Sequence, residues 1–506
     1  MEKITYGAEI EKPVTNLTNG QPHRVSQDFF KRLYEEGQKR DAAPTYHLSD
    51  ISGEIIGVRT NDLGEQGVDN GWNLLETSLP YQLSLEDLER IMRLDLQTVQ
   101  QALEQEGASV INLSIHPRGR RDLETYRAFV APKGIYPYLW YRGWDHTAGI
   151  DARAQNSPTT GIEPYQAADA VSVIIGAGAA FIGLFANSPY EEGKRSEYKE
   201  ARLKMWERMM WYAKVPGDRS TATFPPERFR TLAQYFNWMF GEKTSIHFII
   251  ASGEKGDYKG ISDRIIVIPQ NPSVLDYLSA NSWQGVLLKD IFNGFNINPV
   301  TIIPDISHME AMQFAQFSGA RIRYGLNHEG FPLQEFLEAC RHPERTEVEK
   351  IFEGWAKFMY IEGRDPGANF PDRQLWDAGD EIAQSVEIAP SAIQAGLIRN
   401  LREATAFIDR FNWQHLRVLR ETAIKDGLQG EVDGVSVYEF AKRILEIAGK
   451  GLTAEEQEFL KYPLWVLQTG ENGADRAIKF VEETCHATSL SDALRQLVIN
   501  RQVILK

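Results

Sequence analysis

The chain has 506 residues, of which 42% are hydrophobic and 25% charged, and its formal net charge is −15. This composition is typical of a globular protein with a sizeable core, and the length allows two or three domains. The acidic balance argues against nucleic acid or an anionic membrane as a partner. With only Cys340 and Cys485, neither a disulfide framework nor a Cys-ligated zinc site is expected. No basic region followed by an apolar run opens the sequence, so we expect no signal peptide and a cytoplasmic location.

The first predicted strand, ITYGAEIEKPV (residues 4–14), contains two carboxylates two positions apart. Because side chains alternate along a strand, Glu9 and Glu11 share one face, and Pro13 is expected to end the element. Parallel carboxylates repel unless a positive charge lies between them, which suggests a cation site. The alternative is a solvated face, since acidic residues are usually exposed, and this stretch alone favours that alternative.

A second acidic segment, VDNGWNLLETSLPYQ (68–82), has Asp69 and Glu76 at the two ends of an apolar strand-like run. Alternation places Glu76 on the same face as Trp72. A glutamate among apolar neighbours is costly to bury unless it is paired or bound to a cation. The alternative is an edge strand with Glu76 turned to solvent.

Helices are expected near residues 26–40 and over 84–106, where Ser84 is the N-cap. The apolar run 170–186 is short for a membrane span and is interpreted as a buried core helix. The further strand-like segments are INLSIHP (111–117), RAFVAP (127–132), GIDARAQ (149–155), SIHFII (245–250), RIIVIP (264–269) and GARIRYGL (319–326). Strands separated by helices and hairpin-like gaps indicate an α+β fold with a mainly antiparallel sheet.

The pattern changes near residue 380, after which the periodic segments are typical of helices. We therefore predict an α+β domain over residues 1–380 and a C-terminal helical region over residues 381–506. The boundary rests on this change of pattern alone.

Two further segments carry polar groups suited to ligand binding. In GIDARAQNSP (149–158), a strand places Asp151, Arg153 and Gln155 on one face, which offers donors and acceptors to a polar ligand. The same face is also typical of a surface strand. The second segment, LFANSPYEEGKRSEYKEARLKMWERM, covers residues 184–209. There a polar glycine loop with Lys194 is followed by a helix that carries Arg202 and Trp206, and PGDRSTATFPPERF (216–229) then supplies Arg219.

These last motifs resemble the plant and proteobacterial glutamate–cysteine ligases, the second family of these carboxylate–amine ligases. The resemblance is carried by LFANSPYEEGK, by Arg202 four residues before Trp206, and by GDRSTATFPPERF. The opening GAEIE resembles the family's first metal-binding strand, and DNGWNLLETSLP resembles the matching segment of the wider superfamily. INLSIHPRG, GIDARAQNS and the closing helices VSVYEFAKRILEIAGKGL and EEQEFLKYPLWVLQTGENGADRAIKFVEE resemble further family segments.

The resemblance implies a fold like that of glutamine synthetase and the guanidino kinases. In that fold a curved antiparallel sheet with flanking helices holds ATP, magnesium and glutamate on its concave face. Two or three Mg²⁺ ions, bound by Glu9, Glu11, Asp69 and Glu76, would relieve the repulsion between these carboxylates.

The implied reaction has two steps and uses ATP as co-substrate. The γ-carboxylate of glutamate attacks the terminal phosphate, and an amine then displaces phosphate to form an amide, as in glutathione biosynthesis. Because carboxylate and triphosphate repel, catalysis needs positive charge and alignment. The resemblance implies the following cationic and polar residues: Arg202, Arg219 and Arg323 as catalytic residues, and Arg153, Gln155, Lys194 and Arg321 as substrate or ATP contacts. A surface cation is the alternative for each.

The sequence departs from the family over HMEAMQFAQFSGARIRYGLNHEG (308–330), where Phe–Pro–Glu–Val–Arg and then Leu–Glu–Met–Arg are expected. In one register Arg323 matches the final arginine and Arg321 replaces a metal-binding glutamate. In the other register Arg321 matches the earlier arginine, and Asn327 and Glu329 fall where Glu and Arg belong. Either register alters one ligand, and a guanidinium in place of a carboxylate changes the local charge by two units.

Three functions remain open on the sequence. The first is a glutamate–cysteine ligase, and the second is a carboxylate–amine ligase for a different amine or acid. The third is a catalytically silent relative that binds a ligand or partner. The altered strand in residues 308–330 is consistent with a silent relative, whereas the retained carboxylates argue against it. The sequence gives no indication of oligomeric state.

Overall fold

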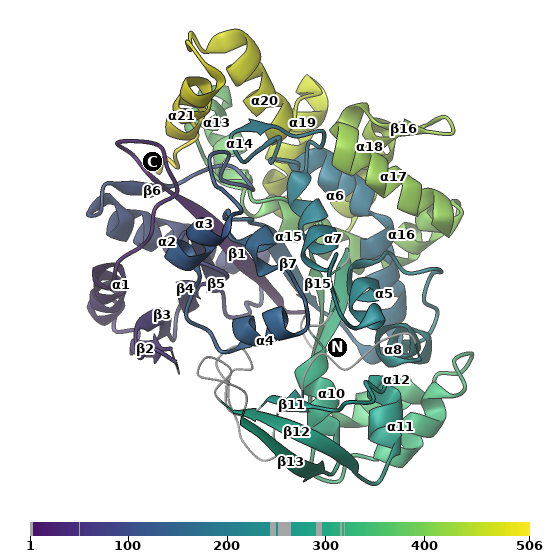
Figure 1. Ribbon diagram of the computed structural model, residues 1–506. Coiled ribbons are helices and arrows are strands. Elements are labelled where there is room, and N and C mark those ends of the chain that lie inside the picture. The colour runs from purple at the N-terminus through teal and green to yellow at the C-terminus, as the bar shows by residue number, and fades with distance from the viewer. Residues whose placement is uncertain are drawn as a thin grey trace.

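The computed structural model describes residues 4–49, 51–242, 249–250, 265–289, 296–313, 316–317 and 319–506. A nine-stranded antiparallel sheet forms its centre, in the order β14-β15-β7-β1-β5-β4-β3-β2, with β6 paired to β1 (Figure 1). The prediction of mixed helices with a large antiparallel sheet is confirmed. The strands are β1 (Tyr6–Asn16), β2 (Thr45–Leu48), β3 (Ile55–Thr60), β4 (Gly64–Val68), β5 (Leu74–Ser78), β6 (Ala108–Val110), β7 (Asn156–Gly161), β14 (Ala320–Leu326) and β15 (Ala356–Gly363).

Smaller sheets lie outside this centre. One, of four strands, lies below the central sheet in Figure 1. Its strands are β10 (Ile249–Ile250), β11 (Ile265–Val267), β12 (Trp283–Lys289) and β13 (Asn296–Ile302). The two-stranded ribbons are β8 (Tyr190–Glu191) with β9 (Lys194–Arg195), and β16 (Glu431–Val432) with β17 (Val435–Ser436).

The predicted first strand exists but continues beyond Pro13 to Asn16. Pro13 pairs with Leu74, and its carbonyl accepts a hydrogen bond from the Ile111 amide. Proline removes only a donor, and the carbonyl that remains is used by the neighbouring chain. The prediction that Pro13 ends the element was therefore wrong, whereas the alternation of Glu9 and Glu11 with the buried Ile10 is as predicted.

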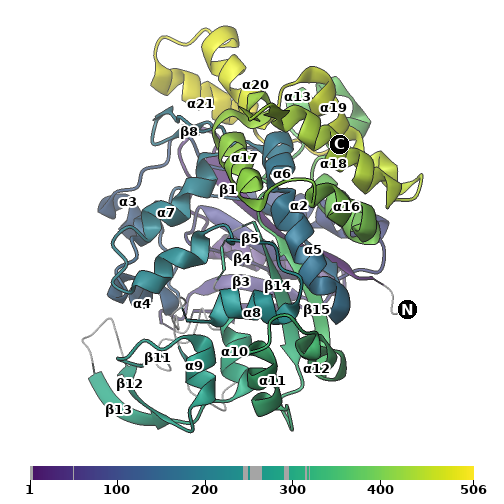
Figure 2. The ribbon, with the colours of Figure 1, turned by 90° about the vertical axis from the view of Figure 1, so that its right-hand side faces the viewer.

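Two of the predicted helices have the expected bounds, α1 (Gln27–Lys39) and α2 (Leu85–Glu104). Ser84 caps α2 by accepting a hydrogen bond from the Asp87 amide, as predicted. Further helices before β15 are α3 (Leu123–Phe129), α4 (Ile135–Tyr141), α7 (Met205–Met209), α8 (Leu232–Phe240), α9 (Val274–Ser279), α10 (Ile306–Met312), α11 (Leu333–Cys340) and α12 (Glu347–Trp355). Helices α3, α4 and α7 lie together on one side of the central strands (Figure 2).

The long apolar segment forms two buried helices, α5 (Pro164–Gly176) and α6 (Gly178–Phe185), bent by 46°. A Cβ on Gly178 would come within 2.3 Å of an Asp365 carboxylate oxygen, so glycine permits the close approach at the bend. In the part of the chain that the structure describes, no single helix is long and apolar enough to cross a membrane; only α5 and α6 taken together pass that test.

Three predicted strands are not strands. Residues 127–132 lie at the end of α3, which Asp122 caps, and residues 111–117 form bends with isolated bridges. Residues 149–155 are a turn in which only Arg153 and Gln155 make single bridges, before β7 begins at Asn156. Short segments of mixed pattern took the conformation that their tertiary neighbours favoured. Strands near 264–269 and 319–326 are confirmed, and residues 245–248 lie outside the described residues.

Helices dominate the chain after β15. They are α13 (Arg373–Ala378), α14 (Asp380–Ser385), α15 (Ala389–Arg399), α16 (Leu401–Ile408), α17 (Trp413–Asp426), α18 (Val437–Lys450), α19 (Lys461–Thr469), α20 (Gly473–Lys479) and α21 (Leu490–Asn500). Helix α15 packs against β7 and β1, and the Val503 amide donates to the Val110 carbonyl at β6. The helical region thus contacts the central sheet directly, and a domain boundary at residue 380 stays a prediction.

A buried ion pair links the sheet to α2. The Lys12 ammonium lies 2.6 Å from an Asp95 oxygen, with both side chains fully buried, and it also donates to the Thr77 hydroxyl at 2.8 Å. Removal of one partner leaves an uncompensated buried charge, so Lys12→Met is expected to lower the free energy of unfolding by ~3–5 kcal/mol.

Urea denaturation would measure this change. Lys31→Met is the matched control, because its pair with Asp28 on α1 is exposed, and its unfolding midpoint should stay near that of the wild type. Equal midpoints for the two variants would contradict a structural role for the buried pair.

Candidate active site

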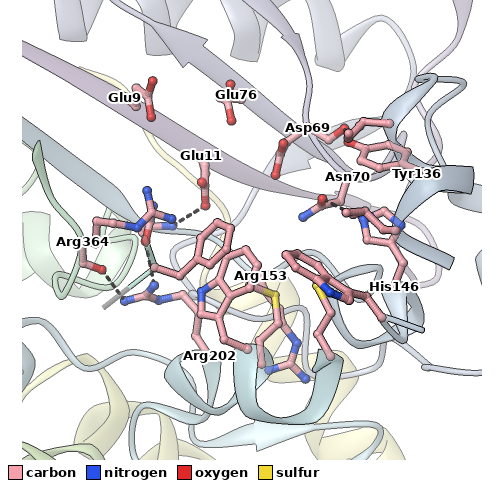
Figure 3. A pocket seen from close by; sticks show the side chains of 18 of the residues that line it. Glu9, Glu11, Asp69, Asn70, Glu76, Tyr136, His146, Arg153, Arg202 and Arg364 are labelled. Atoms are coloured by element: carbon pink, nitrogen blue, oxygen red, sulfur yellow. Dashed lines mark hydrogen bonds between the residues drawn. The ribbon is translucent and has the colours of Figure 1, made fainter. Parts of the chain in front are cut away.

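One pocket of about 150 Å³ lies over β1 and β5 and collects side chains from most of the sequence. Carboxylates occupy one side of it, and Arg202 and Arg364 lie beside Glu11 (Figure 3). Its lining residues are Glu9, Glu11, Asp69, Asn70, Glu76, Ile135, Tyr136, Tyr138, Leu139, Arg142, Trp144, His146, Arg153, Gln155, Arg202, Met205, Trp206, Met209, Phe317, Arg321 and Arg364.

The sheet register places two glutamates directly opposite each other. Glu11 of β1 pairs with Glu76 of β5, and like charges in such positions repel. Asp69, just after β4, offers a third carboxylate, and one oxygen from each of the three lies within 4.8 Å of the others. Burial, followed by the charges of Asp69 and Glu76, raises the pKa of Glu11 well above its ordinary value. Glu9 lines the same pocket, so all four predicted metal ligands converge.

The donor set fits a hard divalent cation. Glu11, Asp69 and Glu76 provide only oxygen ligands, which magnesium prefers, and a cation between them would offset their repulsion. One Glu11 oxygen accepts a hydrogen bond from the Gln155 amide at 2.9 Å, which fixes the carboxylate. These three residues, with Glu9 beside them, would hold the ion.

Arg202 is a buried cation whose position is fixed by its own hydrogen bonds. Its guanidinium donates to the Gln155 side-chain oxygen at 2.8 Å, to Glu200 at 2.8 Å and to the Asp365 carbonyl at 3.0 Å. Arg202 belongs to the 3₁₀-helix Ala201–Lys204, directly before α7, rather than to the single helix that the sequence predicted. The link through Gln155 joins this cation to the backbone that holds Glu11.

Three arginines surround one glutamate at the end of the sheet. Arg321 of β14 pairs directly with Glu362 of β15, and its guanidinium lies 2.7 Å from that carboxylate. Arg364 lies 2.6 Å from Glu362, and Arg323 lies 3.3 Å away. The nearby guanidinium charges, Arg321 first, outweigh burial and hold the pKa of Glu362 well below its ordinary value.

The opposite wall of the pocket is apolar and aromatic. Trp206 of α7 stacks on Phe317 with 3.8 Å between ring centroids, and Trp144 meets the edge of the same ring. Asp218 fixes this wall, because its carboxylate accepts from the Trp144 indole at 2.7 Å and forms a buried ion pair with Arg142. The sequence analysis did not identify this wall, whose members come from four separated segments.

A chain of hydrogen bonds orients Asn70 at the pocket. Burial lowers the pKa of His146 to about 4, so its ring is neutral near pH 7. The Trp140 indole donates to the Tyr126 hydroxyl, which in turn donates to Nδ1 of His146 at 3.1 Å. Nε2 of His146 then donates to the Asn70 side-chain oxygen at 3.1 Å, which leaves the Asn70 amide nitrogen as the group that a ligand oxygen would meet.

Comparison with known proteins relates this region to a sequence family. Residues 5–244 match the sequence profile of glutamate-cysteine ligase family 2. This part of the chain is similar to that family. The matched range includes the four carboxylates that line the pocket together with Arg153, Gln155 and Arg202. This match supports the prediction of a glutamate–cysteine ligase-like enzyme.

A solved structure with low sequence identity supports the fold. The glutamate–cysteine ligase of Francisella tularensis in complex with AMP has a TM-score of 0.51 and 10% identity, over 98% of this chain and 88% of that one. A bifunctional glutathione synthetase from Pasteurella multocida has a TM-score of 0.44 and 13% identity, over 98% of this chain and 52% of that one. No curated protein sequence matches the chain.

Three predicted contacts of the ligase family are not among the residues that line the pocket. Lys194 is exposed at the start of β9 in the β8–β9 ribbon, where the sequence analysis expected a loop near the ligand. Arg219 is exposed and donates to the Trp211 carbonyl at 2.7 Å. Arg323 is half-buried beside Glu362. In contrast, Arg153 and Arg321 do line the pocket, and Arg153 is already paired with Asp151 and Glu191.

The structure offers a third register for the strand in which the sequence departs from the family. The run Ile361–Glu362–Gly363–Arg364 in and just after β15 has the Leu–Glu–Met–Arg spacing, and Arg364 lines the pocket. Arg321 lies directly opposite this glutamate in the sheet. The Glu–x–Arg spacing itself was the signal that the sequence analysis missed, since it compared only residues 308–330.

The carboxylate cluster predicts how magnesium affects stability. Without Mg²⁺ and above the raised pKa of Glu11, Glu11→Gln should raise the free energy of unfolding by about 1 kcal/mol, because it removes one of two directly opposed charges. The stabilisation that Mg²⁺ gives the wild type should be largely lost in this variant. Thermal melting with and without MgCl₂ would measure both effects, and Glu36→Gln on the exposed face of α1 is the control.

The sign of the pH dependence follows from the raised pKa of Glu11. The folded state retains a proton that the unfolded state releases, so stability without Mg²⁺ should fall as pH rises from the ordinary glutamate range to the raised pKa. Glu11→Gln should flatten this slope. An unchanged slope in the variant would contradict the assigned electrostatics.

Proposed function

We propose that the protein is an ATP-dependent ligase that joins the γ-carboxylate of glutamate to the amine of cysteine through an acyl phosphate, as a step of glutathione biosynthesis. The observation that carries the proposal is the convergence of Glu11, Asp69 and Glu76 in the region that matches the ligase family. A cytoplasmic location belongs to this proposal. So does a sheet of the glutamine synthetase and guanidino kinase kind, with the catalytic residues in 1–380.

The carboxylates would bind the cations that offset the repulsion between the two substrates. Two anions, a carboxylate and a triphosphate, must approach each other for the first step. Bound Mg²⁺ would supply positive charge to the phosphate oxygens as a Lewis acid. Glu11, Asp69 and Glu76 contribute by holding such ions at one fixed place, with Glu9 as a further ligand for a second or third ion.

The arginines supply charge that needs no metal. Arg202 is buried and anchored by Gln155, so its guanidinium is oriented before substrate arrives. In Arg364, Nε is buried without a hydrogen-bond partner among the described residues, which suits an incoming carboxylate or phosphate oxygen. We propose that these two cations align the reacting anions. Arg321 then has a positioning role, because with Glu362 it fixes Arg364.

Arg153 and Gln155 are also proposed to act through other groups. Gln155 connects Arg202 with the strand of Glu11 by its side chain and its backbone. Arg153 forms ion pairs with Asp151 and Glu191, which balance its charge. We therefore propose that it stabilises the pocket wall. Lys194, Arg219 and Arg323 contribute at most from outside the pocket of this structure.

The apolar wall favours a second candidate within the same chemistry. Stacked Trp206 and Phe317 with the neighbouring Met205, Met209 and Leu139 offer contacts to an apolar group. This composition suits an amine that is larger and more apolar than cysteine. The reaction type and the metal site are the same in both candidates.

Turnover measurements test the ligase proposal. ADP release by the purified protein should require MgCl₂, glutamate and an amine together. Arg202→Ala should lower kcat/KM by ~10–100-fold, because it removes hydrogen bonds from a charged group. Arg195→Ala is the control, since that side chain is exposed and pairs with Glu482 at the surface. ADP release that does not require an amine would contradict the proposal. An unchanged kcat/KM in Arg202→Ala would also contradict it.

An amine panel separates the two ligase candidates. Cysteine, alanine, leucine and phenylalanine would be compared at equal concentration with ADP release and product mass as readouts. Preference for cysteine supports the first candidate, and a higher kcat/KM for phenylalanine or leucine supports the second. Trp206→Ala should reduce the use of the large amines more than the use of alanine.

A further inference from the structure

A second cavity, of about 560 Å³, lies on the other face of the central sheet. It is bounded by α2, by the segment from α14 to the start of α15, and by the last residues of the chain. Lys12 and Thr77, which face this side, are the sequence neighbours of Glu11 and Glu76. The two sites therefore lie on opposite faces of the same two strands, β1 and β5.

Glu387 is a buried carboxyl that lines this cavity. It lies between α14 and α15 and is 7% exposed. Its Oε1 atom is buried without a hydrogen-bond partner in the described parts of the chain. A buried polar oxygen without a donor is costly, so this atom is expected to have a partner that comes from outside the chain.

The nearby ammonium of Lys12 cannot fill this role. Its three donors are used by Asp95 at 2.6 Å, by the Thr77 hydroxyl at 2.8 Å and by the Ile10 carbonyl at 3.3 Å. The interior cluster then contains two carboxyls, Asp95 and Glu387, and one cation. When Glu387 is ionised, an additional positive group would balance the cluster.

The other walls indicate what would carry that charge. Apolar side chains from α2, from α13–α15 and from the chain end form much of the cavity surface: Met92, Leu96, Trp376, Ala383, Ile388 and Leu505. Exposed Gln97 and Gln101 lie at its rim, and the rim acid Glu89 is already paired with Arg93. A single buried carboxyl with apolar surroundings suits an ammonium group rather than a divalent metal ion.

We propose that this cavity binds a small molecule that carries a primary ammonium group on an apolar body, with the ammonium against Glu387. The ammonium would donate to the Glu387 carboxylate, and the apolar body would cover Met92, Leu96 and Trp376. This inference does not rest on the ligase proposal, since none of these residues lines the first pocket.

The ionisation of Glu387 provides a signature for such binding. Burial raises its pKa to about 8, with Asp95 and Glu89 acting in the same direction and Lys12 and Arg93 opposing them; Lys506 at the chain end also lines the cavity. An ammonium favours the carboxylate form, so binding at pH 7 should release a proton. Affinity should rise about tenfold from pH 7 to pH 9, where the carboxyl is already ionised while an alkylamine, like lysine, stays charged.

Calorimetry on the full chain tests the proposal with two matched probes, n-hexylamine and the uncharged 1-hexanol. Hexylamine should bind saturably and at least tenfold more tightly than hexanol. Titrations at pH 7 in phosphate and in HEPES should differ in heat by the release of a proton, and this difference should become small at pH 9. Equal affinities for the two probes, or heats at pH 7 that do not depend on the buffer, would overturn the proposal.

Glu387→Gln keeps the shape of the side chain and removes its charge. It should weaken hexylamine binding at least tenfold at pH 9 and abolish proton release at pH 7. Glu349→Gln is the control, because Glu349 is also a buried carboxyl with an unpartnered oxygen but lies on α12, outside this cavity. Unchanged affinity in Glu387→Gln would refute the assignment; if that variant fails to fold, the wild-type probe and buffer comparisons decide.

Discussion

The pairing of Glu11 with Glu76 across β1 and β5 is the constraint on which the site depends. A sheet that places two carboxylates directly opposite each other, with Asp69 beside them, stores repulsion in its centre. Such an arrangement is stable only because the rest of the fold provides many buried contacts, and it becomes favourable when a cation occupies the space between the oxygens. Burial and the neighbouring charges of Asp69 and Glu76 raise the pKa of Glu11 for this reason.

Positive charge is distributed around the cluster at fixed places. Arg202 and Arg364 lie close enough to Glu11 to counteract part of the rise in its pKa. Each is itself held by other groups, Arg202 by Gln155 and Glu200, and Arg364 by Glu362. The pocket therefore presents anion-binding and cation-binding groups in separate positions, which is what a reaction between two anionic substrates requires.

The same two strands also carry buried charge on their other face. Lys12 alternates with Glu11 along β1, and its ion pair with Asp95 fixes α2 against the sheet. Glu387 adds a further carboxyl to that interior, next to a cavity with apolar walls. One pair of strands thus separates two electrostatically distinct compartments, and the alternation of side chains produces both.

The sequence by itself determined the local features of this protein. Alternation in GAEIE placed Glu9 and Glu11 on one face, Ser84 marked the start of α2, and the spacing of motifs indicated the ligase family. These features depend on neighbours within a few residues, so pattern and propensity suffice to predict them. The strand prediction for 149–155 was wrong because short segments take the conformation that distant neighbours select.

Only the tertiary structure decided how distant segments meet. It paired Glu11 with Glu76, brought Glu362 and Arg364 opposite Arg321, and left Lys194 and Arg219 outside the pocket. The register of strands and the packing of loops depend on contacts between residues that lie tens or hundreds of positions apart. A linear pattern contains no information on such distances. For that reason all four predicted carboxylates line the pocket, whereas three of the six predicted cations lie outside it.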